Sequence, residues 1–187
     1  MKKSIITLLL LFIVGCSSSI PNKTYYQLDS DFSDSKVLQA RKVNDAIVIE
    51  EIKVANYLDK NGIVYQTGEL EYTTANNNLW LTSLSDQITQ RLVQDLSILL
   101  PNYLVTTQPA NHPKLTVKLF IDAFHGVYTG DAVIKGRWQM TNNKNEVITK
   151  NFDYTLRLGE DGYLALVKTL SKGWQEEEID LVRSLKL

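Results

Sequence analysis

Three long segments in the C-terminal half alternate apolar and polar residues with a period of two, which is the pattern of a β-strand with one buried face. They span residues 115–123, 132–140 and 148–158, and the segments between them are short and rich in turn-forming residues. Consecutive strands joined by short turns form an antiparallel meander with one face open to water. The apolar face must be covered by other elements of the chain.

Two amphipathic helices are expected to supply this cover. Apolar residues recur at three- and four-residue steps from 81 to 100, with Ser83 placed to cap the helix and Pro101 to end it. A second helix is expected after Asp161, its predicted N-cap, with Gly173 weakening its middle. The fold class that follows is α+β. It is a two-layer single domain in which both helices pack on one face of an antiparallel β-sheet, made of the meander plus a hairpin.

The hairpin is predicted from the segment before the first helix. Short strands are expected at residues 25–28, 46–54, 57–58 and 63–65. Asn61 and Gly62 both accept positive φ, so this pair predicts a tight turn that joins the last two strands. The asparagines at 76–78 predict a further turn.

Residues 1–15 have the organisation of a secretory signal peptide. Lys2 and Lys3 give a basic start, and residues 5–14 are apolar except for Thr7. A membrane-spanning helix needs roughly 20 apolar residues, so this stretch is too short to remain as a span. The residue that follows it, Cys16, is the only cysteine in the chain.

Residues 13–16 resemble the lipobox of bacterial lipoproteins, which implies cleavage before Cys16 and acylation of that cysteine at its sulfur and new amino terminus. The simpler alternative is an ordinary signal peptide cut a few positions later. Ser17 stands where an aspartate retains enterobacterial lipoproteins in the inner membrane, so the resemblance favours the outer membrane. Residues 16–24 are then a lipidated tether with a reach of about 25–30 Å, and residues 25–187 are the folded domain.

Charge and side-chain chemistry argue against several classes of function. Without residues 1–15 the chain has 18 basic and 21 acidic residues, a formal net charge of −3, so we expect no nucleic acid partner. His112 and His125 are the only histidines; neither belongs to a catalytic pattern, and we expect both to be solvated. The acids at 29, 31 and 34 lack the glycine and closing glutamate of a calcium loop. We therefore expect no catalytic residue, no metal and no cofactor.

Two sequence blocks resemble the ABC-type transport auxiliary lipoproteins, the family that includes the paraquat-inducible lipoproteins. Residues 25–28 are similar to the Tyr-Tyr-x-Leu that opens their folded domain, and residues 48–66 are similar to their aliphatic run, Tyr-Leu-Asp step and Ile-Val-Tyr strand. Trp80 and a closing helix extend the similarity over nearly the whole domain. Ala55 and Gln66 depart from the proline and the basic residue usual at their places, so no binding role is carried over for Gln66.

The resemblance implies an outer-membrane lipoprotein, facing the periplasm, that is a non-catalytic docking component of an intermembrane lipid transport system. Its partners are then the outer membrane, through the lipid anchor, and a periplasmic protein bearing MCE domains. A homo-oligomer is also compatible with the sequence. The alternative from another class is a lipoprotein cofactor for outer-membrane protein assembly or cell-wall synthase activation, although a synthase activator generally needs a longer linker. Lipid carriage within the domain would require a cavity.

Six aromatic or aliphatic side chains are the candidate contacts for a partner: Tyr57, Leu58, Ile63, Tyr65, Phe120 and Phe124. The first four belong to the predicted hairpin. By alternation, Phe120 and Phe124 share the face assigned to water with Lys118 and Asp122. Either that strand is covered on both sides or these two rings meet a partner.

Overall fold

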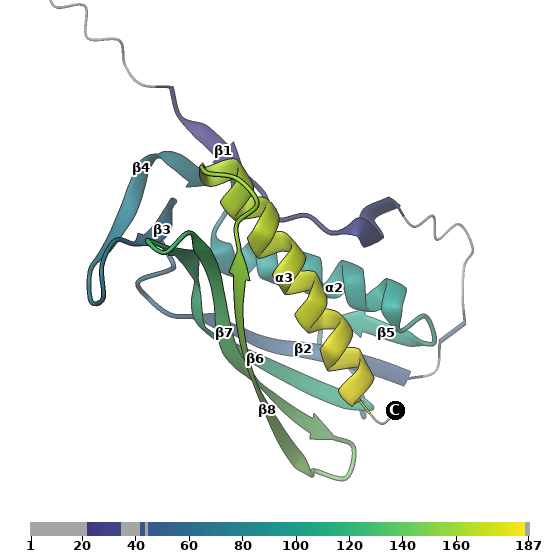
Figure 1. Ribbon diagram of the computed structural model, residues 1–187. Helices are drawn as coiled ribbons and strands as arrows, with labels where there is room; N and C mark the ends of the chain where they lie inside the picture. Colours follow the sequence, from purple (N-terminus) through teal and green to yellow (C-terminus); the bar gives the residue numbers. More distant parts are fainter. Residues whose placement is uncertain (1–21, 35–41, 44, 186–187) are drawn as a thin grey trace, which may run out of the picture.

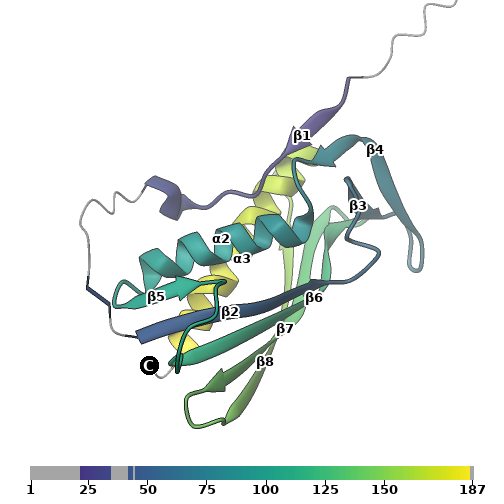
Figure 2. The same ribbon diagram turned by 180° about the vertical axis from the view of Figure 1, so that it is seen from behind.

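The computed structural model describes residues 22–34, 42–43 and 45–185, so Cys16 and most of the predicted tether lie outside the described residues. Along the chain the elements are β1 (Thr24–Tyr26), the 3-10 helix η2 (Asp31–Asp34), β2 (Asp45–Val54), β3 (Gly62–Gln66), β4 (Tyr72–Trp80), α2 (Leu84–Leu99), β5 (Tyr103–Thr106), β6 (Leu115–Val127), β7 (Asp131–Asn142), β8 (Val147–Arg157) and α3 (Tyr163–Ser184). The strands form one sheet, and α2 and α3 lie together on one of its faces (Figures 1 and 2). The predicted α+β class is confirmed.

Strand β6 is the strand on which the sheet is built. On one side it pairs with β7 along its length, and β8 continues from β7, so the predicted antiparallel meander is confirmed. On the other side, β2 runs parallel to residues 115–121 and β3 runs parallel to residues 126–127. Strand β4 joins β3 antiparallel, whereas β1 and β5 add to β4 and β2 in parallel.

The sheet is therefore mixed, and the expectation of a wholly antiparallel sheet is wrong. Alternation in a sequence specifies which side chains are buried, but it does not specify the direction of the neighbouring strand. The chain places α2 and β5 between β2 and β6, and such a long connection allows two neighbouring strands to run parallel.

The first helix follows its predicted boundaries. The Ser83 hydroxyl accepts a hydrogen bond from the Asp86 backbone N–H at 3.1 Å, and Leu100, just before Pro101, is the C-cap. The apolar stripe of α2 is fully buried against the sheet and consists of Leu84, Ile88, Leu92 and Leu96.

The second helix begins differently from the prediction. Its N-cap is Gly162, with φ of 103° and no side-chain capping bond, so the assignment of Asp161 as the cap is wrong. Gly173 lies where α3 approaches the sheet, and a Cβ there would come within 2.4 Å of Leu156 Cδ1 and 2.7 Å of Ile134 Cδ1. The glycine thus allows close packing of α3 on the sheet, at a small cost in helix propensity.

The predicted hairpin across Asn61 and Gly62 does not form. The turn in this segment is formed by residues 56–58. Neither Asn61 nor Gly62 adopts the positive φ that a tight hairpin turn would require, and β3 pairs with β4 and β6 instead. Residues 76–78 are not a turn either, because β4 continues through them with an irregular register opposite β3. Gly62 is needed for a different reason: a Cβ there would lie 2.1 Å from the Ala75 carbonyl oxygen.

A buried polar cluster joins the segment after β1 to both helices. The Leu28 N–H donates to Gln87 Oε1 at 2.8 Å, the Asp29 N–H donates to Ser171 Oγ at 3.2 Å, and the Ser30 hydroxyl donates to Asp95 Oδ1 at 2.9 Å. These bonds attach one short segment to α2 through two side chains and to α3 through a third.

Charges are balanced inside the same cluster. Arg91 Nη2 is 2.6 Å from Asp95 Oδ1, and both side chains are nearly inaccessible to water. Burial, together with the neighbouring Asp95 carboxylate, raises the pKa of Glu178 well above its usual value. Both effects favour the neutral form of the Glu178 side chain on α3, whereas the nearby Arg91 guanidinium, which already pairs with Asp95, opposes them.

Replacement of Gly62 by alanine should destabilise the domain. The added methyl group would meet the Ala75 carbonyl, which is backbone and cannot rotate away, so we expect a loss of about 1–3 kcal/mol in the free energy of unfolding. Gly159→Ala is the matched control, because nothing lies within 4 Å of a Cβ at that position. Urea denaturation of both variants measures the difference, and an unchanged midpoint for Gly62→Ala would contradict the packing described here.

Candidate functional site

Three of the six predicted contact residues belong to the core and cannot meet a partner. Leu58, Ile63 and Phe124 are 1%, 0% and 1% exposed, respectively. Leu58 and Ile63 were expected on a hairpin that does not form, and their side chains instead fill the interior beneath β3. Tyr57, Tyr65 and Phe120 keep part of their surface in water.

Phe124 is buried because β6 contains a β-bulge. Phe120 faces Arg137 and Ile121 faces Gly136, but Ala123 faces Lys135, so Asp122 is an extra residue without a partner on β7. One extra residue reverses the alternation that follows it. Phe124 therefore points to the helices, where its ring centroid is 6.5 Å from that of Trp174 and 6.4 Å from that of Trp80.

The opposite side of the sheet, away from α2 and α3, is here termed the helix-free face. Its upper part carries an aromatic cluster of Tyr57, Tyr72 and His125, which come from the turn after β2, the start of β4 and the end of β6. The ring centroids are 5.3–6.1 Å apart, all in edge-to-face arrangement. The Tyr57 hydroxyl donates to the Asp122 carbonyl at 2.9 Å, which fixes the turn to the bulge.

His125 is buried beneath the two tyrosines, so the expectation that it is solvated is wrong. Its Nδ1 donates to the Gly126 carbonyl at 3.0 Å. Burial, with the charge of Lys135 nearby, lowers the pKa of His125 below its usual 6.5. Burial, together with Tyr72 and Asp122, raises the pKa of Tyr57 to about 12. Both side chains are neutral near pH 7, so the cluster offers an uncharged aromatic surface.

The middle of the helix-free face is amphipathic. The Arg137 guanidinium lies 4.4 Å from the centroid of the Phe120 ring, and its Nη1 is 3.7 Å from Asp122 Oδ2. Beside them Lys135 pairs with Asp153 at 3.0 Å. These ion pairs are exposed and individually weak, so their members can exchange partners when another protein docks.

A shallow hollow of about 410 Å³ lies among these charges and is lined by Asp122, Lys135, Gly136, Arg137, Asn151, Phe152 and Asp153. Tyrosine, phenylalanine and arginine are enriched in the centres of protein interfaces, where flat rings and a forked cation bury much area at low entropic cost. The helix-free face therefore has the chemistry of a protein-binding surface.

Tyr65 lies elsewhere. Its ring is on the side of the sheet covered by helices, against Gly126 and Leu166, and its hydroxyl donates to the Val127 carbonyl at 2.9 Å. There it lines a hollow of about 320 Å³ at the start of α3, with Leu158 and Tyr163. The structure thus brings Tyr57 and Phe120 to one face but separates Tyr65 from them.

Two residues of the helix-free face were not predicted, Tyr72 and Arg137. Both reach the site through strand pairing, which a single sequence does not reveal. Counting back from the β6–β7 turn in strict register would pair Phe120 with Trp138, and only the bulge at Asp122 makes Arg137 its partner.

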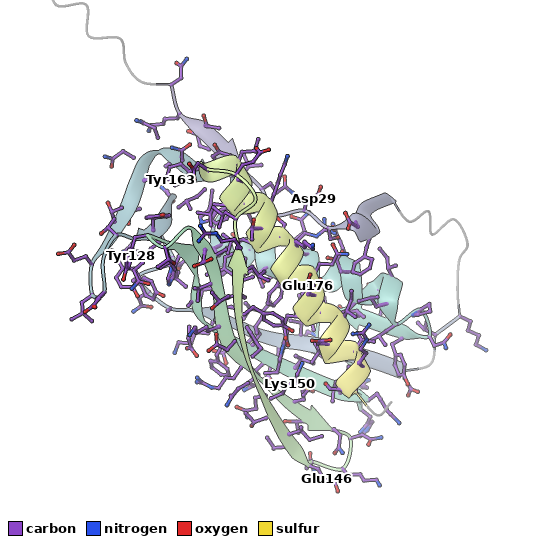
Figure 3. The ribbon with its side chains drawn as sticks, in the orientation of Figure 1. Asp29, Tyr128, Glu146, Lys150, Tyr163 and Glu176 are labelled. Carbon is purple, nitrogen blue, oxygen red and sulfur yellow. The ribbon has the colours of Figure 1, made fainter. Side chains whose placement is uncertain are left out.

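Two acidic side chains of the second helix, Glu177 and Asp180, bind side chains of the sheet. Trp138 Nε1 donates to Glu177 Oε1 at 2.6 Å, and Lys150 Nζ lies 3.1 Å from the same oxygen. Figure 3 shows Lys150 on β8, facing the lower half of α3. The Tyr154 hydroxyl donates to Asp180 Oδ2 at 2.8 Å, and this bond lowers the pKa of the Asp180 carboxyl. Among the described residues no three His, Cys, Asp or Glu side chains gather as a metal site.

Comparison with known proteins gives a consistent result. A model of the family described as ABC-type transport auxiliary lipoprotein component matches residues 26–179. The intermembrane transport lipoprotein PqiC of Escherichia coli (strain K12) is 35% identical over 186 residues, covering 100% of this chain and 98% of that protein. PqiC of Shigella flexneri matches to the same extent. The part of the chain that the structure describes contains no helix long and apolar enough to cross a membrane.

Two solved structures share the fold. A crystal structure of an uncharacterized protein superposes with a TM-score of 0.76 at 35% identity, covering 87% of this chain and 98% of that chain. Protein XCC0632 from Xanthomonas campestris has a TM-score of 0.65 at 12% identity, covering 85% of this chain and 92% of that chain, and is similar in fold alone.

The aromatic cluster predicts a titration that NMR can follow. The pKa of the His125 ring should lie below 6.5, because burial disfavours its charged form. The ring should therefore contribute to the free energy of unfolding above pH 6.5, and this contribution should be lost as the pH falls through the pKa of the folded protein. Tyr57→Ala, which uncovers the ring, should move the midpoint upward toward 6.5. Tyr128→Ala is the control, since Tyr128 is exposed and makes no ring contact with His125. A wild-type titration midpoint at or above pH 6.5 would contradict the burial. The His112→Gln variant leaves a single histidine signal and so assigns it to His125.

Proposed function

Because this chain belongs to the family of ABC-type transport auxiliary lipoprotein components, we propose that it is an intermembrane transport lipoprotein of the outer membrane, anchored through lipid on Cys16 and facing the periplasm. There it acts without catalysis, as a docking component for a periplasmic protein with MCE domains that carries lipid between the two membranes. The observation that carries the proposal is the 35% identity to the intermembrane transport lipoprotein PqiC over the full length of this chain.

The anchor is the first part of this proposal. Residues 1–15 serve as the signal peptide, residues 16–24 as the lipidated tether and residues 25–187 as the domain. Because β1 begins at Thr24, eight residues after Cys16, the domain stays within about 30 Å of the anchored sulfur even when the tether is fully extended. A short tether suits a protein that holds something at the membrane rather than one that reaches away from it.

The helix-free face is the second part. It combines the exposed edges of Tyr57 and Tyr72 with the Phe120–Arg137 stack and with weak ion pairs around it. The face covered by α2 and α3 has most of its apolar surface already buried, so the helix-free face is the better candidate for the partner protein.

Loss of the acceptor cysteine should release the protein from the membrane. Cys16→Ser removes the only thiol that can form the thioether, so we expect loss of palmitate incorporation and loss of the protein from the membrane fraction. Ser17→Asp is the matched control: it should keep the lipid but move the protein from the outer to the inner membrane in density-gradient fractions. A membrane-bound Cys16→Ser protein would contradict the anchor.

Removal of the central side chains of the helix-free face should weaken capture of the partner. We expect Phe120→Ser/Arg137→Ser to reduce co-purification with the periplasmic MCE-domain protein by about tenfold or more, as for the centre of an interface. Lys144→Ser, an exposed cation in the β7–β8 turn, should change nothing. Thermal unfolding of each variant separates a lost contact from a lost fold.

The same capture experiment distinguishes the alternative function. If crosslinking in cells with the wild-type protein recovers an outer-membrane assembly factor or a cell-wall synthase and no MCE-domain protein, the transport role is wrong and the alternative holds. If the partner is recovered equally by wild type and the double variant, the partner binds another face.

A further inference from the structure

We propose that the end of the domain at which β1 and α3 begin rests directly on the phospholipid surface. This membrane-facing end comprises Tyr25, Leu81, Leu164, Lys168 and Lys172. The inference builds on the proposed anchoring at Cys16, but it adds that the folded domain has a defined lipid-contacting surface and therefore a fixed orientation.

The membrane-facing end exposes large apolar side chains that the fold does not use. Tyr25, Leu81 and Leu164 are 55%, 56% and 58% exposed. Leu81 follows β4 directly, and its N–H donates to the Tyr26 carbonyl at 2.8 Å, so it lies beside β1. Tyr25 and Leu164 line the same groove, of about 500 Å³, between β1 and the outer side of α3.

Two lysines border this groove on α3. Leu164, Lys168 and Lys172 are spaced by four residues and so form one stripe along the helix. Both lysines are exposed, and neither forms an ion pair with a described residue. A lysine beside apolar side chains can lay its methylene stem on lipid while its ammonium reaches the phosphate, and tyrosine places its ring and hydroxyl across the same boundary.

The position of this end relative to the anchor favours a lipid surface as the occupant. Figures 1 and 2 both show β1 leading into the domain beside the first turns of α3. Figure 3 shows Tyr163, the first residue of α3, at the end opposite Glu146 in the β7–β8 turn. Tyr25 is only nine residues after Cys16, so the groove lies within about 30 Å of the anchored sulfur, the distance over which a tethered surface meets its own membrane.

The charge of this end suits a surface of mixed phospholipids. Asp29 and Asp31 line the same groove, and Glu160, Asp161 and Glu176 lie close to the lysines, so the region has no net positive charge. We therefore expect adhesion to come mainly from the apolar side chains, with the lysines directing orientation, and to depend weakly on salt.

Site-directed quenching tests the orientation in the lipidated protein. Because the thiol of Cys16 is consumed by the lipid, a cysteine introduced at Leu164 or at Ile148 is the only one available for a fluorophore. Ile148 is the matched control, at 54% exposed and at the opposite end, in β8. The labelled proteins are placed in vesicles of phosphatidylethanolamine and phosphatidylglycerol that carry a nitroxide in the upper acyl chain.

We expect severalfold stronger quenching at Leu164→Cys than at Ile148→Cys, and a clear reduction at Leu164→Cys when Lys168→Glu and Lys172→Glu are added. Equal quenching at the two positions would overturn the proposal. Weak quenching at Leu164→Cys with strong copy-to-copy crosslinking there would also overturn it, since a second copy of the chain would then cover the groove. Flotation with the vesicles is measured on the same samples, so failure of the anchor appears as lost flotation and is distinct from failure of the orientation.

Discussion

The structure depends on the way in which β6 shares its two edges. One edge binds β7 throughout, and the other is divided between β2 and β3. The division occurs near the bulge at Asp122, where the added residue increases the local twist and directs the last residues of β6 toward β3. The helices, the N-terminal strand and the aromatic cluster all take their places from these two pairings.

The sequence predicted well what depends on local periodicity. The three alternating segments became β6, β7 and β8, and the α2 boundaries followed from Ser83 and Pro101. It predicted poorly what depends on pairing at a distance. Asn61 and Gly62 have the composition of a tight turn, but the space that Gly62 provides is occupied by the backbone of β4, which no local pattern reports.

The candidate site shows the same division. Phe120 was correctly placed on the side away from the helices, because the alternation before Asp122 is regular. Phe124 was placed on that side by the same count and is in the core, because one unpaired residue lies between them. Tyr72, Arg137 and the burial of His125 could not be foreseen, since each depends on strands that are distant in the sequence.

The bonds that join Leu28, Asp29 and Ser30 to both helices have a mechanical consequence. In the proposed function the domain is fixed to a membrane at its N-terminal side and binds a partner elsewhere, so it would come under tension whenever the two membranes move apart. That load enters through β1, whose hydrogen bonds to β4 share it with the sheet. It then reaches the hydrogen bonds to Gln87 and Asp95 on α2 and to Ser171 on α3. The force is thereby distributed over the sheet and both helices, so β1 cannot separate from β4 without also loading these hydrogen bonds in the interior.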